Sequence, residues 1–129
     1  MKFLIIDDSG LSRRMARKIV ESFGHSAIEA EDGLRGIELY SVEHPDVVVL
    51  DLLMPGIPGL GTLASIKSFD PKCHVIICSS DLQTATRDKA MEMGAMGFIN
   101  KPMHSDELRV LLDSIPEVAL ETRRTLTTI

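Results

Sequence analysis

The segment Val47–Leu50 restricts the fold most, because four apolar residues in succession lead directly into the carboxylate of Asp51. We interpret Val47 to Asp51 as one strand. An apolar run of this kind is typical of a strand buried on both faces, as in a parallel sheet covered by helices. Pro55 and Gly56 then indicate a turn. A carboxylate at the end of such a strand is either paired with a cation or used for chemistry.

Apolar runs and helical patterns alternate along the rest of the chain. Strands are predicted at Phe3 to Ile6, Ser26 to Ala30, Val47 to Asp51, Val75 to Cys78 and Met96 to Ile99. The predicted helices span roughly residues 11–23, 34–40, 59–69, 82–93 and 105–115. Five strands, each followed by a helix, predict an α/β fold with a parallel sheet and helices on both faces.

Two of these helices carry further expectations. The first has its apolar residues on neighbouring turns, at Leu11, Met15, Ile19 and Phe23. The last is predicted to start with Ser105 as its N-cap, followed by two acidic residues that favour the positive end of the helix dipole.

Composition excludes several classes of protein. At 129 residues the chain fits one domain, and its net charge of −5 argues against direct nucleic-acid binding. No apolar run approaches the ~20 residues of a membrane span, and Asp7 follows the first apolar run too soon for a signal peptide. We therefore expect a cytoplasmic protein without membrane insertion. Cys73 and Cys78 are expected to be reduced structural thiols on opposite faces of one strand, and the four histidines to be surface or loop residues.

Polar residues end or follow four of the predicted strands: Asp7-Asp8, Asp51, Ser79-Ser80 and Asn100-Lys101-Pro102. The carboxyl ends of parallel strands meet at one edge of a sheet, where such folds bind ligands. Converging carboxylates repel one another unless a cation is present, and Mg²⁺ prefers a few carboxylates together with water and phosphate oxygens. Acids, metal, hydroxyl and ammonium together predict a site for phosphoryl transfer.

The same residues carry a resemblance to a known family. Over residues 2–115 the chain resembles the receiver domain of bacterial two-component response regulators, of the small single-domain kind typified by the chemotaxis regulator. The motifs are Asp7-Asp8, Glu29-Ala30-x-Asp32-Gly33, Asp51-x-x-Met54-Pro55-x-x-x-Gly59, Ser79-Ser80, Gly94-Ala95-x-Gly97-Phe98 and Lys101-Pro102. The resemblance implies a doubly wound, flavodoxin-like sheet with strand order 2-1-3-4-5, a receiver domain over 1–115 and a C-terminal extension or linker over 116–129.

The resemblance implies a role for each acid of the site. Asp51 would be the phosphoacceptor, taking a phosphoryl group from the phosphohistidine of a sensor histidine kinase or phosphotransfer protein. Asp8 and Asp51 would bind Mg²⁺, Asp7 would contribute through water, and the backbone carbonyl of Leu53 would complete the protein ligands. The protein would be a signalling switch that catalyses only its own phosphorylation and dephosphorylation.

The remaining motif residues are implied to bind the phosphoryl group and to report its presence. Ser79 and Lys101 would bind phosphoryl oxygens, and the Lys101–Pro102 peptide bond would be cis. Phe98 matches the family's aromatic switch position, which responds when Ser79 moves to the phosphate. Output would pass to a downstream protein through the face formed by the fourth helix, fifth strand and fifth helix, from a monomer or a phosphorylation-dependent dimer.

Two alternatives remain open. Gly59 to Ala64 fits the pattern G-x-G-x-x-A of a dinucleotide-binding turn, with Asp81 ~20 residues further on. That reading is weak, because a Pro-rich loop separates the predicted strand from Gly59. The second alternative concerns output: a stand-alone regulator is favoured over the receiver part of a longer protein with an effector domain.

Overall fold

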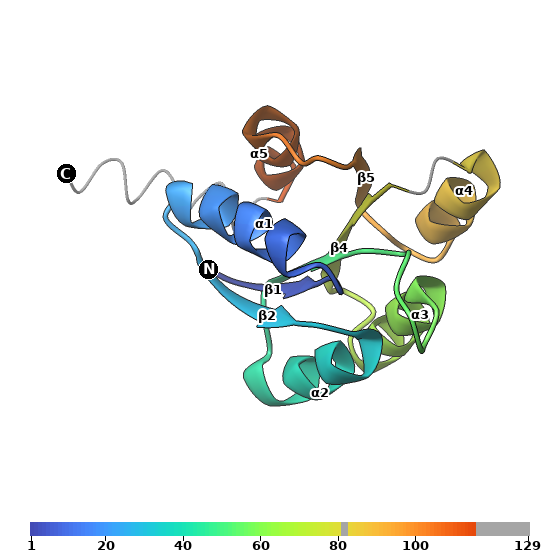
Figure 1. The fold of residues 1–129 in the computed structure, drawn as a ribbon. Helices are drawn as coiled ribbons and strands as arrows, with labels where there is room; N and C mark the ends of the chain where they lie inside the picture. Colours follow the sequence, from blue (N-terminus) through green and yellow to red (C-terminus); the bar gives the residue numbers. More distant parts are fainter. Residues whose placement is uncertain (81–82, 116–129) are drawn as a thin grey trace.

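The computed structural model describes residues 1–80 and 83–115, in which strands and helices alternate (Figure 1). The strands are β1 (Lys2–Ile6), β2 (Ser26–Ala30), β3 (Val47–Leu50), β4 (His74–Ser79) and β5 (Gly97–Asn100). The helices are α1 (Gly10–Ser22), α2 (Gly33–Glu43), α3 (Gly59–Phe69), α4 (Thr84–Glu92) and α5 (Ser105–Asp113). Position 82, where a helix was predicted to begin, and the predicted extension 116–129 lie outside the described residues.

The five strands form one parallel sheet in the order β2-β1-β3-β4-β5. This confirms the predicted α/β fold and its flavodoxin-like strand order. The order reverses next to β1, so the carboxyl ends of β1 and β3 lie side by side at the switch point of the sheet. Ile6 is paired with Leu50, which makes Asp7 and Asp51 the next residues on two neighbouring strands.

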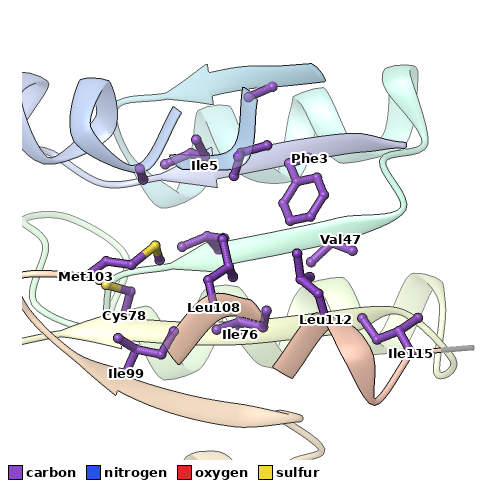
Figure 2. Packing of buried hydrophobic residues seen from close by; sticks show 14 residues of the cluster. Phe3, Ile5, Val47, Ile76, Cys78, Ile99, Met103, Leu108, Leu112 and Ile115 are labelled. Carbon is purple, nitrogen blue, oxygen red and sulfur yellow. The ribbon is translucent and has the colours of Figure 1, made fainter. Parts of the chain in front are cut away.

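The core consists of two apolar layers, one on each face of the sheet. On one face Phe3 and Ile5 of β1 pack with residues of α1 and α5, as Figure 2 shows for Leu108 and Leu112. On the other face Leu4 and Ile6 pack with residues of α2, α3 and α4. The alternation arises because successive side chains of a strand point to opposite faces. The four residues of β3 are at most 3% exposed, so the apolar run before Asp51 is covered on both sides.

The buried side of α1 differs from the apolar residues noted in the sequence. Leu11 is 62% exposed and Met15 is 42% exposed, whereas Ala16 and Val20 are buried. A spacing of four residues advances by more than one turn of 3.6 residues, so a row of such positions winds slowly around the helix. Only the later members of the row, Ile19 and Phe23, reach the core, where they are partly buried.

The predicted N-cap of α5 is wrong by one residue. His104 has the extended backbone of an N-cap (φ −111°, ψ 146°), and Ser105 is already the first residue of the helix. No side chain caps this end, but Asp106 and Glu107 lie in the first turn, where negative charge is favourable.

Two further expectations concern cysteine and histidine. Cys73 and Cys78 are free and buried in opposite layers of the core, as expected, although Cys73 precedes β4 instead of lying in it. His25 lies in the loop before β2, within the expectation of a surface or loop position, and it is buried there with its ring stacked on Phe3 at 5.4 Å between ring centroids. Among residues 1–80 and 83–115, no helix has the length and apolar character needed to cross a membrane.

Candidate functional site

The candidate site lies at the carboxyl edge of the sheet, where backbone hydrogen bonds fix the ends of the strands. The N–H of Asp51 donates to the carbonyl of Ile6 at 3.0 Å, which continues the ladder between β1 and β3 beyond their last residues. The N–H of Lys101 donates to the carbonyl of Ser79 at 3.0 Å and joins β5 to β4 in the same way. The predicted site residues therefore begin from rigid, neighbouring backbone positions.

Asp7, Asp8 and Asp51 converge at this edge, as predicted. Each offers a carboxylate oxygen, and these three atoms lie within 4.8 Å of one another. Asp7 and Asp51 are buried, at 5% and 3% exposure, whereas Asp8 is exposed. Within the described part of the chain they form the one group of three acidic, histidine or cysteine residues whose donors converge in this way.

Lys101 reaches the two buried acids from the end of β5. Its Nζ lies 2.7 Å from Oδ2 of Asp7 and 2.8 Å from Oδ2 of Asp51, and its side chain is 20% exposed. Burial alone would lower the pKa of this lysine, but the hydrogen bonds from Lys101 to Asp51 and Asp7 outweigh it and raise the pKa. The ammonium is therefore held in its charged form between two carboxylates.

For Asp7, in contrast, burial has a larger effect on the pKa than the hydrogen bonds do. Burial raises the pKa of the Asp7 carboxyl, whereas the hydrogen bond from Lys101 and that from the backbone N–H of Ser9 lower it without cancelling the effect of burial. The nearby Asp51 carboxyl also raises this pKa through repulsion. A second cation at the site would stabilise the charged form of Asp7 further.

Asp51 has both oxygens oriented by hydrogen bonds. Oδ1 accepts from the backbone N–H of Leu53 at 3.0 Å, and Oδ2 accepts from Lys101. Asp51 lines a cavity of about 200 Å³ together with Cys78, Lys101 and Met103. A carboxylate that is oriented and open to a small cavity is suited to act as a nucleophile.

The other predicted residues lie on β4, on β5 and in the loops that follow β3 and β5. Ser79 is fully buried at the end of β4, and Leu53 is half exposed in the loop after β3. Phe98 of β5 is partly buried against the layer formed with α2, α3 and α4, and the Arg87 guanidinium carbon lies 5.4 Å from its ring centroid. The Lys101–Pro102 peptide bond is cis, in agreement with the expectation.

The donor set fits Mg²⁺. Three carboxylates offer hard oxygen ligands within a short span, and the exposed Asp8 leaves the cluster open to water and to a phosphate oxygen. Leu53 is held next to Asp51 by its N–H, which brings its backbone close to the cluster. Bound Mg²⁺ would neutralise the acids that Lys101 neutralises only in part.

A larger cavity of about 660 Å³ lies among other residues, including Tyr40, His44, Phe69 and His74. Among the described residues, Asp7, Asp8 and Asp51 are the only acidic, histidine or cysteine side chains whose metal-binding atoms converge in a group of three, and none of them lines this larger cavity. We therefore assign the site by its charges and geometry, and not by the size of the cavity.

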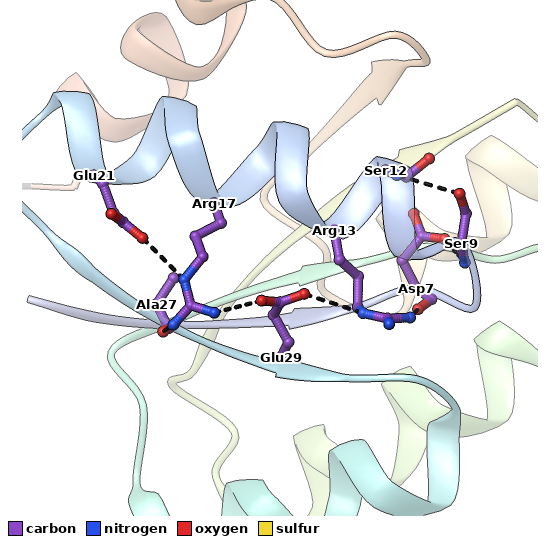
Figure 3. Close-up of polar contacts among 8 residues, drawn as sticks. All are labelled: Asp7, Ser9, Ser12, Arg13, Arg17, Glu21, Ala27 and Glu29. Carbon is purple, nitrogen blue, oxygen red and sulfur yellow. Dashed lines mark hydrogen bonds and ion pairs between the residues drawn. The ribbon is translucent and has the colours of Figure 1, made fainter.

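Sequence reasoning missed one contact to the site. Arg13 of α1 donates from Nη1 to the backbone carbonyl of Asp7 at 2.7 Å and from Nε to Glu29 at 3.1 Å (Figure 3). The signal in the sequence is weak, because it consists of an arginine on a helical turn close to the acid pair and of a glutamate on the next strand.

Comparison with known proteins agrees with the resemblance seen in the sequence motifs. The family model for the response regulator receiver domain matches residues 3–113. The chemotaxis protein CheY of Halobacterium salinarum is 36% identical over 115 residues, covering 89% of this chain and 93% of the relative. CheY of Listeria monocytogenes is 38% identical over 114 residues, covering 88% and 96%. The CheX–CheY–BeF3–Mg²⁺ complex of Borrelia burgdorferi contains a similar fold, with a TM-score of 0.84, 29% identity, and coverage of 89% of this chain and 88% of that one.

Proposed function

Because the chain belongs to the response regulator receiver domain family, we propose that Asp51 accepts a phosphoryl group from the phosphohistidine of a histidine kinase or phosphotransfer protein. The family makes the chain a phosphorylatable signalling switch of the CheY type. The acceptor residue, the donor and the roles of the neighbouring residues are our proposal.

The Lys101 ammonium between two buried carboxylates carries this proposal most directly. Its distances of 2.7 Å to Asp7 and 2.8 Å to Asp51 place a cation where negative charge is concentrated. Two buried acids and an exposed third, with one carboxylate oxygen of each within 4.8 Å of the others, fit a site that binds a divalent cation and an anionic group.

The proposed transfer uses groups whose positions are known. An oxygen of Asp51 attacks phosphorus, the bond from phosphorus to the histidine nitrogen of the donor breaks, and its electron pair stays on that nitrogen. Lys101 then donates to a phosphoryl oxygen, and the Ser79 hydroxyl donates to another. Asp8, Asp51 and the Leu53 carbonyl would hold Mg²⁺, with Asp7 acting through water, and the ion would neutralise further phosphoryl charge.

Output is proposed to pass through Phe98 and the face formed by α4, β5 and α5 to a downstream protein. The partial burial of Phe98 supports a ring that can pack inward, since Phe lacks the hydroxyl that would need a partner there. We propose a stand-alone regulator, as a monomer or a phosphorylation-dependent dimer. This proposal follows the two chemotaxis relatives, more than nine-tenths of which this chain covers.

Intact-mass spectrometry tests the phosphoacceptor. The chain is incubated with Mg²⁺ and acetyl phosphate, and we expect it to gain the mass of one phosphoryl group. Asp51→Asn should abolish the gain, whereas the control Asp106→Asn, on an exposed position of α5, should keep it. Omission of Mg²⁺ should slow it strongly. A full mass gain in Asp51→Asn would disprove the assignment.

A further inference from the structure

Arg13 makes a contact that no part of the proposed chemistry requires directly. Its Nη1 donates to the backbone carbonyl oxygen of Asp7 at 2.7 Å, and Figure 3 shows the guanidinium reaching from α1 to the end of β1. The carboxylate of Asp7 takes no part in this bond, since Oδ1 accepts from the N–H of Ser9 and Oδ2 pairs with Lys101. Arg13 therefore contacts the backbone of the acid pair and leaves its ligand atoms available.

The contact acts on the peptide that joins the two acids. The carbonyl of Asp7 and the N–H of Asp8 belong to one planar peptide unit, so a donor that fixes the carbonyl also fixes the direction in which residue 8 leaves it. The other side of Asp7 is fixed as well, because its own N–H donates to the carbonyl of Ala30 at 3.1 Å. Asp8 is exposed, and Arg13 restrains its backbone by fixing the orientation of the peptide that joins it to Asp7.

Glu29 of β2 holds the guanidinium in this position. Oε1 of Glu29 accepts from Nε of Arg13 at 3.1 Å, and the side chains are only 24% and 20% exposed. Oε2 of the same carboxylate accepts from Arg17, which also donates to the carbonyl of Ala27 (Figure 3). The fixed fork of the guanidinium lets Arg13 bind a side chain on one edge and a backbone carbonyl on another.

We propose that Arg13 is a positioning residue that orients the Asp7–Asp8 peptide for Mg²⁺ binding, acting through the backbone without touching the metal or the phosphoryl group. The inference rests on the proposed function, since it presupposes that these acids bind the metal. Groups that orient metal ligands from outside typically change metal affinity by 10–100-fold when removed.

Arg17 provides the matched control. It lies one turn along α1, binds the same Glu29 and donates to a carbonyl of β2, so its removal disturbs the same network. Among the described residues, its hydrogen-bond partners are Glu21, Ala27 and Glu29, and Asp7 is not one of them. A purely structural role of Arg13 would give both arginines similar effects.

The experiment compares Arg13→Met, Arg13→Lys and Arg17→Met with the unmodified chain. Methionine keeps most of the aliphatic length and removes all donors, whereas lysine keeps one donor but loses the fork. Calorimetric titration with Mg²⁺ measures affinity, the carbonyl ¹³C shift of Asp7 in metal-free protein reports the hydrogen bond, and urea unfolding measures stability.

We expect Arg13→Met to weaken Mg²⁺ binding ~10-fold and to shift the Asp7 carbonyl signal, Arg13→Lys to be intermediate, and Arg17→Met to stay within ~2-fold. Equal affinities for Arg13→Met and the unmodified chain, or equal losses in the Met variants of Arg13 and Arg17, would overturn the inference. Should Arg13→Met not fold, the comparison of Arg13→Lys with Arg17→Lys decides in the same way. Failure of the unmodified chain to bind Mg²⁺ would instead overturn the proposed function.

Discussion

At the scale of single residues, the buried charge of Asp7 is unfavourable for the stability of the folded protein. Asp7 is 5% exposed, and burial is the main reason why the pKa of its carboxyl is raised. Lys101 neutralises part of the charge, but it is shared with Asp51. Functional sites commonly keep such groups, because the charge that binds a ligand also opposes folding in its absence.

Asp7→Asn should therefore stabilise the metal-free protein at neutral pH, by about 1 kcal/mol. The raised pKa means that the folded state binds a proton more tightly than the unfolded state, so the free energy of unfolding falls as the pH rises from 3.8 through the raised native pKa. The advantage of the Asn variant should accordingly vanish below that interval, where the wild-type carboxyl is neutral. Urea unfolding between acidic and neutral pH measures this difference.

Saturating Mg²⁺ should reverse the order of the two proteins. Ligand at a hundred times its dissociation constant stabilises a folded protein by about 2.7 kcal/mol, and the Asn variant lacks one of the acids near the metal. A variant that is less stable than the wild type without Mg²⁺ would show that the ion pair of Asp7 with Lys101 outweighs the burial of the charge.

At the scale of secondary structure, the start of α3 depends on a close approach of two backbone segments. A Cβ at Gly59 would lie 2.4 Å from the Cα of Leu52 and 2.9 Å from the carbonyl oxygen of Asp51. The first turn of α3 therefore packs directly against the backbone of Asp51 and Leu52. Gly61, two residues later in the same helix, has no such contact, since its nearest neighbour would be a side-chain atom of Ile57 at 3.4 Å.

Gly59→Ala should lower the free energy of unfolding by ~1–3 kcal/mol, because backbone must move to admit the methyl group. The same substitution at Gly61 should be neutral or stabilising by up to ~1 kcal/mol, since alanine favours a helix over glycine. Urea unfolding of both variants checks the pair. Equal effects would mean that helix propensity, and not the contact with Leu52, determines the result at Gly59.

The strands were predictable because each is a short apolar run bounded by polar or turn residues. Ser26–Ala30 matches the prediction at both ends, and β3 differs only in ending at Leu50 instead of Asp51. The acids and Lys101 could be placed at one edge for the same reason, since strand ends in a parallel sheet share an edge. The exposed Leu11 and the helical Ser105 could not be predicted, because the orientation of α1 and the first residue of α5 depend on packing between elements. Nor does the sequence reveal that Arg13 bonds to a backbone carbonyl, since every residue type offers one.

At the scale of the whole molecule, the apolar layer shared by α1 and α5 extends to the last described residue. Ile115 is 2% exposed and belongs to the same cluster as Phe3 and Val47, so the end of the described chain packs near the amino-terminal edge of the sheet (Figure 2). We propose from this that residues 1–115 contain the complete folding unit, in agreement with the family match over 3–113.

If residues 1–115 contain the complete folding unit, a fragment of these residues should unfold in urea with a free energy within ~0.5 kcal/mol of the full chain. Ile115→Ala in that fragment should cost ~2–4 kcal/mol through lost burial and a residual cavity. The control Val110→Ala, at a position that is 70% exposed on α5, should cost little. A large loss on removing residues 116–129 would place part of the folding unit beyond Ile115.

The position of Lys101 implies that its ammonium and Mg²⁺ would compete for the same carboxylates. In the structure the ammonium of Lys101 is the counterion of both Asp7 and Asp51. Under the proposed function, Mg²⁺ would compete with that ammonium for the carboxylate oxygens, and Lys101 would become available to donate to the phosphoryl group. The free energy of Mg²⁺ binding would then be the difference between the free energies with which Mg²⁺ and the ammonium bind these oxygens. Replacement of Lys101 by methionine would therefore tighten metal binding while impairing phosphorylation.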